Sequence, residues 1–183
     1  MRGSEYEGRS LVPEHALQLT GDGGDREITP ALSVDVESTD HGPEHARLTL
    51  AHESGAPFDL LVIDAYSSDA IPIHLMTVEA LALYLSRLAP NGLLALHTTS
   101  RYYKLAPLLA NAASVLGLRT LIQTRHGTAD EPIMLGESPS EVVLMSRDSK
   151  ALEEFSSNSR WRELKPNGQR IWTDDHANLL AAF

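Results

Sequence analysis

The sequence predicts one α/β domain built on an open sheet, and two observations carry that prediction. Short apolar runs of strand length alternate with segments in which apolar residues recur every three or four positions, the spacing of an amphipathic helix. Residues that favour turns separate the two kinds of segment. Strands alternating with helices of this length form right-handed βαβ units, which assemble into an open α/β sheet.

The individual elements follow from the pattern after residue 57. The apolar run 60–63, which ends at Asp64, has the continuous hydrophobicity of a strand buried on both faces. Thr77 is suited to cap a helix that ends before Pro90-Asn91-Gly92, and its apolar positions are Val78, Leu81, Leu85 and Leu88. We expect further strands over 93–99, 118–124 and 141–146, and a helix over 105–116 that Gly117 closes.

The first 57 residues have a different character. They are acidic and interrupted by turn formers such as Gly21-Asp22-Gly23-Gly24-Asp25. Two pieces have the pattern of ordered elements, a strand over 31–36 and a helix over 44–53 with Pro43 suited to its first turn. We therefore expect a partly irregular acidic leader over residues 1–57 and an α/β domain over residues 58–183.

Composition excludes several classes of function. The 183 residues are 42% hydrophobic and 22% charged, which is ordinary for a globular domain. Fifteen Lys and Arg against 25 Asp and Glu give a net charge of −10, which argues against a nucleic-acid partner. The absence of cysteine removes disulfides, thiolate metal sites and cysteine nucleophiles. No apolar run approaches the roughly 20 residues that span a membrane. We expect a cytoplasmic chain without a membrane segment.

The most informative residues follow the first buried strand. Ligands of open α/β sheets bind outside the carboxyl ends of the strands, where this strand delivers Asp64-Ala-Tyr-Ser-Ser-Asp69. Two carboxylates on one loop can hold a cationic ligand, share a proton or bind a metal ion. Either Asp can instead only cap the loop.

This segment resembles a known family. Residues 58–79, Phe-Asp-Leu-Leu-Val-Ile-Asp-Ala-Tyr-Ser-Ser-Asp-Ala-Ile-Pro-Ile-His-Leu-Met-Thr-Val-Glu, are similar to the signature of spermidine synthase-like proteins, the polyamine aminopropyltransferases. The resemblance continues through 88–97 and 100–107 to Trp-Thr-Asp-Asp-His-Ala-Asn-Leu-Leu at 172–180. It implies the carboxyl-terminal part of a Rossmann-like methyltransferase-type fold. It also implies transfer of an aminopropyl group from decarboxylated S-adenosylmethionine to an amine of a small-molecule polyamine substrate.

The resemblance implies roles for several side chains. An amine must lose a proton before it attacks, so a nearby carboxylate can serve as base and counter-ion. By resemblance Asp64 is the base, Asp69 holds a second ammonium group and Tyr66 lines the channel. His74 follows this loop and completes the catalytic candidates. The expected substrate-binding residues are Ser67, Ser68, His97, Tyr102 and Asp174.

The leader departs from the family pattern. The Gly-rich strand-to-helix turn that receives the nucleoside donor has no good match in residues 1–57. Relatives carry Gly-Asp-Ala-Arg before a helix, with the Asp reading the adenine, whereas this chain has Glu44-His45-Ala46-Arg47. We therefore expect a sheet that lacks the first Gly-rich βα units and an incomplete donor site. No cofactor follows from the residues themselves, and decarboxylated S-adenosylmethionine follows only from the resemblance.

Two other functions stay open at the level of sequence. The acidic loop with His74 and His97 can form the site of a hydrolase, either glycosidase-like or metal-assisted, although no metal ligand set is recognisable. Asp174 can also simply cap a final helix. Alternatively the chain is a non-catalytic remnant that self-associates, because a sheet without its first units exposes a strand edge. Either the leader strand or a second copy covers that edge, and we expect a homodimer.

Overall fold

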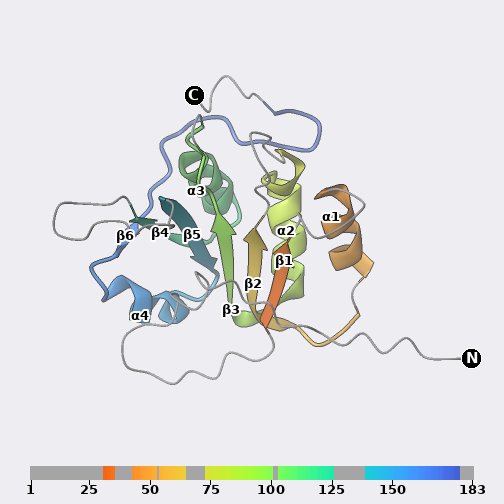
Figure 1. Cartoon of the computed structure of the whole chain (residues 1–183), viewed down its shortest axis with the longest axis horizontal. Helices are drawn as coiled ribbons and strands as arrows, with labels where there is room; N and C mark the ends of the chain where they lie inside the picture. Colours follow the sequence, from red (N-terminus) through yellow and green to blue (C-terminus); the bar gives the residue numbers. More distant parts are fainter. Residues whose placement is uncertain are drawn as a thin grey trace, which may run out of the picture.

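A six-stranded sheet with the strand order β1-β2-β3-β5-β4-β6 forms the centre of the chain (Figure 1). The computed structural model describes residues 31–35, 43–52, 54–64, 73–100, 103–125 and 139–177. The strands are β1 (Ala31–Asp35), β2 (Phe58–Asp64), β3 (Leu88–His97), β4 (Arg119–Arg125), β5 (Ser140–Ser146) and β6 (Trp161–Glu163). β1, β2 and β3 run parallel, whereas β5 is antiparallel to both β3 and β4. β6 pairs antiparallel with β4 at the other edge.

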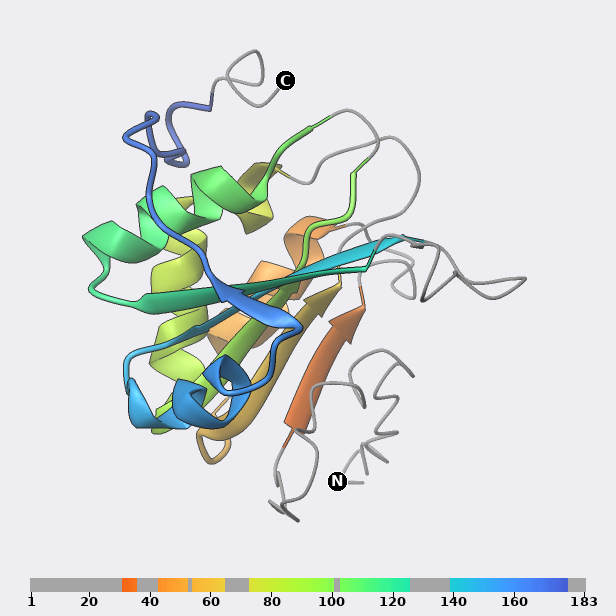
Figure 2. The ribbon, with the colours of Figure 1, turned by 90° about the vertical axis from the view of Figure 1, so that its left-hand side faces the viewer.

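Helices cover both faces of this sheet (Figure 2). One face is packed by α1 (Pro43–His52), α2 (Val78–Arg87) and α3 (Ala106–Val115), and the other by the short helix α4 (Glu153–Ser156) with the 3₁₀ turn η3 (Lys150–Leu152). β2 alternates between the two cores, because Leu61 and Ile63 face the first and Leu60 and Val62 the second. The prediction of a strand buried on both faces is confirmed.

The predicted elements after residue 57 are present with small shifts at their ends. Thr77 caps α2 by accepting a hydrogen bond from the amide of Ala80 at 3.2 Å. Gly117 has φ +71°, the left-handed conformation that favours glycine after a helix. The strands expected over 118–124 and 141–146 are β4 and β5. Local capping chemistry and periodicity are therefore sufficient to place these elements.

The helix that Thr77 caps ends before Pro90-Asn91-Gly92, as predicted, but the following strand begins earlier than the predicted residue 93 and includes these three residues. α2 ends at Arg87, the next residue Leu88 is already extended, and β3 runs without a break from Leu88 to His97. The register between β2 and β3 shifts at this place, between Phe58 and Leu60. Gly92 lies against the backbone there, since an added Cβ would be only 3.0 Å from the carbonyl oxygens of Ala89 and Phe58. Turn-forming residues here serve an irregular strand instead.

The amino-terminal region contributes to the same sheet. β1 pairs with β2 over its whole length, from Ala31 opposite Leu60 to Asp35 opposite Asp64. Leu50 of α1 is buried in the core that α2 and α3 share. The expectation that the strand near 31–36 covers the edge of β2 is therefore confirmed, whereas self-association stays a prediction. Among the described residues, no helix is long and apolar enough to cross a membrane.

Candidate functional site

The parallel strands β2 and β3 end side by side, and each carries a polar side chain at that point. Ile63 of β2 is paired with Leu96 of β3, so Asp64 and His97 are the next residues along each strand. The Nδ1 atom of His97 lies 2.9 Å from Oδ1 of Asp64, and both side chains are about one quarter exposed. Two of the residues that the sequence predicts for the site are thus in direct contact, at the edge where such sheets bind ligands.

The other ring nitrogen of His97 is also engaged. Nε2 lies 2.6 Å from the hydroxyl oxygen of Thr99, and that oxygen accepts a hydrogen bond from the Glu141 amide at 2.7 Å. Thr98, which lies between His97 and Thr99, is buried and also forms hydrogen bonds with Glu141. Its amide donates to the Glu141 carbonyl at 2.8 Å. Its hydroxyl donates to a carboxylate oxygen of Glu141 at 2.8 Å. The end of β3 is therefore held tightly against the start of β5.

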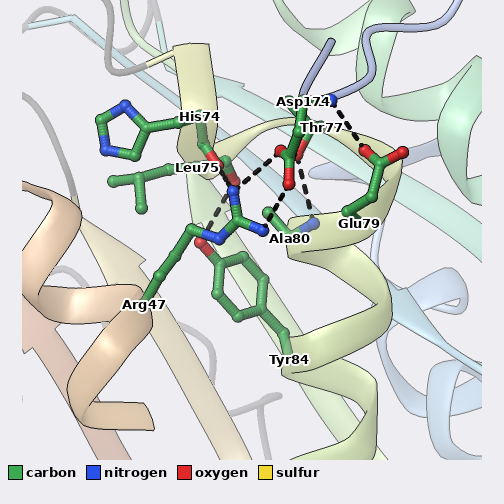
Figure 3. Close-up of polar contacts among 8 residues, drawn as sticks. All are labelled: Arg47, His74, Leu75, Thr77, Glu79, Ala80, Tyr84 and Asp174. Carbon is green, nitrogen blue, oxygen red and sulfur yellow. Dashed lines mark hydrogen bonds and ion pairs between the residues drawn. The ribbon is translucent and has the colours of Figure 1, made fainter. Parts of the chain in front are cut away.

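A second polar cluster lies where α2 begins (Figure 3). The guanidinium of Arg47, from α1, donates to both carboxylate oxygens of Asp174 at 2.8 and 2.9 Å. It also donates to the His74 carbonyl at 2.9 Å. The Thr77 hydroxyl donates to Asp174 at 2.6 Å, and the Asp174 amide donates to Glu79 at 3.0 Å. Arg47 therefore joins three segments that are far apart in the sequence.

The charges in this cluster reinforce one another. The hydrogen bonds from Arg47 hold the pKa of Asp174 below its ordinary value, and Thr77 adds to the same effect. The pKa of Arg47 is raised in turn by its bonds to Asp174. Beneath them, the Tyr84 hydroxyl donates to the Leu75 carbonyl at 3.2 Å, and burial raises the pKa of Tyr84. Arg47 and Asp174 therefore stay charged and Tyr84 stays neutral near neutral pH, so that the cluster links α1 to the carboxyl-terminal segment.

The predicted site residues fall into three groups. Asp64 and His97 come together at the strand ends. His74 and Asp174 lie at the Arg47 cluster, where the Asp174 carboxylate is bonded by Arg47 and Thr77. The ring of His74 points away from Arg47 (Figure 3), and its Nε2 atom is buried without a hydrogen-bond partner among the described residues. The others lie outside the described residues: Asp69, Tyr66, Ser67, Ser68 and Tyr102.

Sequence reasoning missed Arg47, Thr99 and Glu141. In the sequence Arg47 stands out only within Glu44-His45-Ala46-Arg47, because its partner Asp174 is 127 residues away. Thr99 lies two residues after His97, just beyond the end of β3, so its place in the sequence could have identified it as a neighbour of the His97 ring. Within the described part of the chain, no three His, Asp or Glu side chains gather as a metal site.

Comparisons with known proteins complete the description. No family model matches the sequence, and no curated protein matches it. Solved structures do match. A probable spermidine synthase from Corynebacterium glutamicum ATCC 13032 is 17% identical with a TM-score of 0.45, over 73% of this chain and 53% of that one. Spermidine synthase from Thermotoga maritima is 14% identical with a TM-score of 0.40, over 70% and 41%.

MNMC2 from Aquifex aeolicus is 18% identical with a TM-score of 0.37, over 56% of this chain and 28% of that one. The chain thus spans about half of the first of these structures and less of the others. At such identities a likeness concerns the backbone architecture alone. The strand order, with β5 antiparallel beside β3 and helices on both faces, is an open α/β sheet of the kind that the sequence predicts. On the outer side of β2 the described residues supply one strand, β1.

Proposed function

We propose that this chain is a spermidine synthase-like domain that binds an amine of a small polar cation at the ends of β2 and β3. The observation that carries the proposal is the contact of 2.9 Å between Asp64 and His97 at adjacent strand ends. A partly exposed carboxylate oriented by an imidazole is suited to bind an ammonium group and to accept a proton from it. The resemblance of residues 58–79 to the aminopropyltransferase signature supports the same assignment.

The proposed chemistry concerns the amine half of an aminopropyl transfer. The Asp64 carboxylate pairs with the ammonium of the acceptor and takes up its proton, which leaves a neutral amine with a nucleophilic lone pair. Asp69 and Tyr66 are proposed to assist from the following loop, and Ser67, Ser68 and Tyr102 to contact the substrate. The net charge of −10 favours the approach of a polycation.

The donor half does not follow from the described residues. They contain no Gly-rich turn between a strand and a helix of the kind that receives a nucleoside. Decarboxylated S-adenosylmethionine therefore has no site among the described residues, and the proposal concerns the amine alone. A metal-assisted hydrolase would need a set of metal ligands beside Asp64, and among the described residues no three His, Asp or Glu side chains gather as one.

The test is amine binding measured by isothermal titration calorimetry with spermidine and 1,4-diaminobutane. Asp64→Asn removes the charge and is expected to weaken binding about 10- to 100-fold, the value of a charge-assisted hydrogen bond. Asp59→Asn is the matched control, because Asp59 lies at the opposite end of the same strand and carries the same charge. It is expected to bind within about twofold of the wild type at equal ionic strength.

Thermal unfolding of both variants shows that each is folded at the temperature of the titration. The neutral analogue 1,4-butanediol is expected not to bind, because it offers the carboxylate no positive charge. Wild-type chain that binds neither amine would refute the proposed function. Equal losses in Asp64→Asn and Asp59→Asn would refute the assigned site, because the attraction would then come from the overall charge.

A further inference from the structure

The hydrogen bonds around His97 form an ordered chain whose direction can be derived. The backbone amide of Glu141 is a fixed donor, so the Thr99 oxygen accepts from it at 2.7 Å. At the other end, an ionised Asp64 carboxylate only accepts, so the Nδ1 atom of His97 must donate to it at 2.9 Å. Between these ends lies the contact of 2.6 Å between Thr99 and Nε2 of His97.

The neutral form of His97 leaves one arrangement for that middle contact. With the proton on Nδ1, the Nε2 atom of a neutral imidazole is an acceptor, and the Thr99 hydroxyl donates to it. The hydroxyl then accepts from Glu141 and donates to His97. All three bonds are satisfied at once, with a single tautomer of the ring.

The backbone around Thr99 explains why the hydroxyl is held in this position. Thr98 is 1% exposed, and both its amide and its hydroxyl bond to Glu141. The residue after it is therefore pinned against the first residues of β5. Thr99 therefore loses little rotamer freedom when its hydroxyl bonds the His97 ring. Its backbone is already fixed by the surroundings, and its hydroxyl oxygen already accepts a hydrogen bond from the Glu141 amide.

We propose that Thr99 is a positioning residue that selects the Nδ1–H tautomer of His97, and that His97 in this form orients the Asp64 carboxylate. The role of the oriented carboxylate in taking up a proton rests on the proposed function, whereas the tautomer does not. Second-layer hydrogen bonds of this kind set ring orientation in many sites where histidine works with a carboxylate. In this proposal His97 orients the Asp64 carboxylate and does not only contact the substrate.

The first measurement is the tautomer itself, observed by NMR of the full chain with ¹⁵N-labelled histidine. The His97 signals are assigned by their loss in His97→Gln. At neutral pH we expect a protonated Nδ1 and an unprotonated Nε2. A ring with the proton on Nε2, or an imidazolium at neutral pH, would overturn the proposal, because Thr99 would then only accept.

The second measurement uses matched variants of Thr99. Thr99→Val is expected to lower the ratio of the Nδ1–H to the Nε2–H tautomer about two- to tenfold, the equivalent of one neutral hydrogen bond. Thr99→Ser keeps the hydroxyl and should restore the wild-type spectrum. Thr120→Val is the control for the same change elsewhere in the sheet, because Thr120 lies near the start of β4, opposite Met145, and its hydroxyl donates to the Leu164 carbonyl at 2.6 Å. An unchanged His97 spectrum in Thr99→Val, with the fold confirmed by thermal unfolding, would refute the role of Thr99.

Amine binding separates this inference from the function on which part of it rests. Thr99→Val is expected to weaken binding of 1,4-diaminobutane several-fold, less than Asp64→Asn, and Thr99→Ser to restore it. If the wild-type chain binds no amine while the tautomer responds to Thr99 as expected, the proposed function fails and the tautomer selection stands. If amine binding depends on Asp64 but neither the tautomer nor the affinity responds to Thr99, the inference fails alone.

Discussion

Arg47 shows how much of this molecule depends on single side chains that connect distant segments. Its planar guanidinium donates to the two oxygens of Asp174 and to the carbonyl of His74 at the same time. Lysine carries the same charge but not this fork of donors. Because Asp174 is also bonded by Thr77 and donates to Glu79, the carboxyl-terminal segment is fastened to the first turn of α2.

This tie predicts a pH dependence of stability in the acidic range. The pKa of Asp174 is lowered in the folded chain, so below about pH 4 the unfolded chain binds more protons than the folded one at this residue. The stabilisation from Asp174 is therefore present at neutral pH and is lost as the pH falls through its folded pKa. We expect the difference in unfolding free energy between wild type and Asp174→Asn to shrink over this range.

Urea unfolding at a series of pH values between 3 and 6 measures that difference. Asp175→Asn removes the same charge one residue further on and serves as the control. A gap between wild type and Asp174→Asn that stays constant down to pH 3 would contradict the assigned ion pair with Arg47.

At the level of elements, the junction of α2 with β3 is closely packed around Gly92. The chain passes from helix to strand within one residue, and the paired strands shift register beside Gly92. The carbonyl of Gly92 also accepts a hydrogen bond from the buried Ser146 hydroxyl at 2.9 Å. This glycine is needed for a close approach of backbones rather than for a left-handed conformation.

Gly92→Ala is therefore expected to destabilise the chain by about 1–3 kcal/mol, the usual cost of overpacking a core. The added Cβ would meet two carbonyl oxygens at 3.0 Å and the Cβ of Leu88 at 3.1 Å, none of which is the end of a flexible side chain. Asn91→Ala, at the exposed neighbouring position, should change the free energy of unfolding by no more than about 0.5 kcal/mol. Urea unfolding compares the two variants, and equal stabilities would show that the strand relaxes around the new methyl group.

Across the whole molecule, the two tryptophans report on opposite faces of the sheet. Trp172 is buried in the core under α1, α2 and α3, and its carbonyl accepts a hydrogen bond from the Val78 amide at 2.9 Å. Trp161 is buried in the other core, edge-on to Phe155 with ring centroids 5.7 Å apart. The strands β2, β3, β4 and β5 each contribute residues to both cores. Loss of packing in one core therefore disturbs the packing of the other.

We accordingly expect the two faces to unfold together. Trp161→Phe and Trp172→Phe each leave one fluorescent tryptophan, since the chain has two. In each variant the remaining fluorescence should follow the same urea midpoint as the far-ultraviolet circular dichroism of that variant, as in a two-state transition. A fluorescence transition well separated from loss of secondary structure in either variant would show that one layer melts independently.

Local patterns in the sequence were sufficient for much of this architecture. The continuous apolar run before Asp64 predicted a strand buried on both faces. Thr77 marked the start of α2 through its side-chain hydroxyl, and Gly117 marked the end of α3 through its left-handed backbone. The same reasoning placed the start of β3 too late, at residue 93, because Pro90-Asn91-Gly92 lie inside the strand, beside a register shift, although such residues elsewhere make a turn. The presence of proline and glycine in a sequence does not by itself distinguish a turn between elements from an irregular place within a strand.

The strand-end position of Asp64 follows from its place after an apolar run, and the ends of parallel strands share one edge of a sheet. The contact with His97, the hydrogen bonds through Thr99 to Glu141, and the tie between Arg47 and Asp174 depend on tertiary structure. These pairs are joined by strand order and packing, which bring together residues as far as 127 positions apart. Residue type and short spacing specify which groups can bond, but only the folded sheet selects the partners.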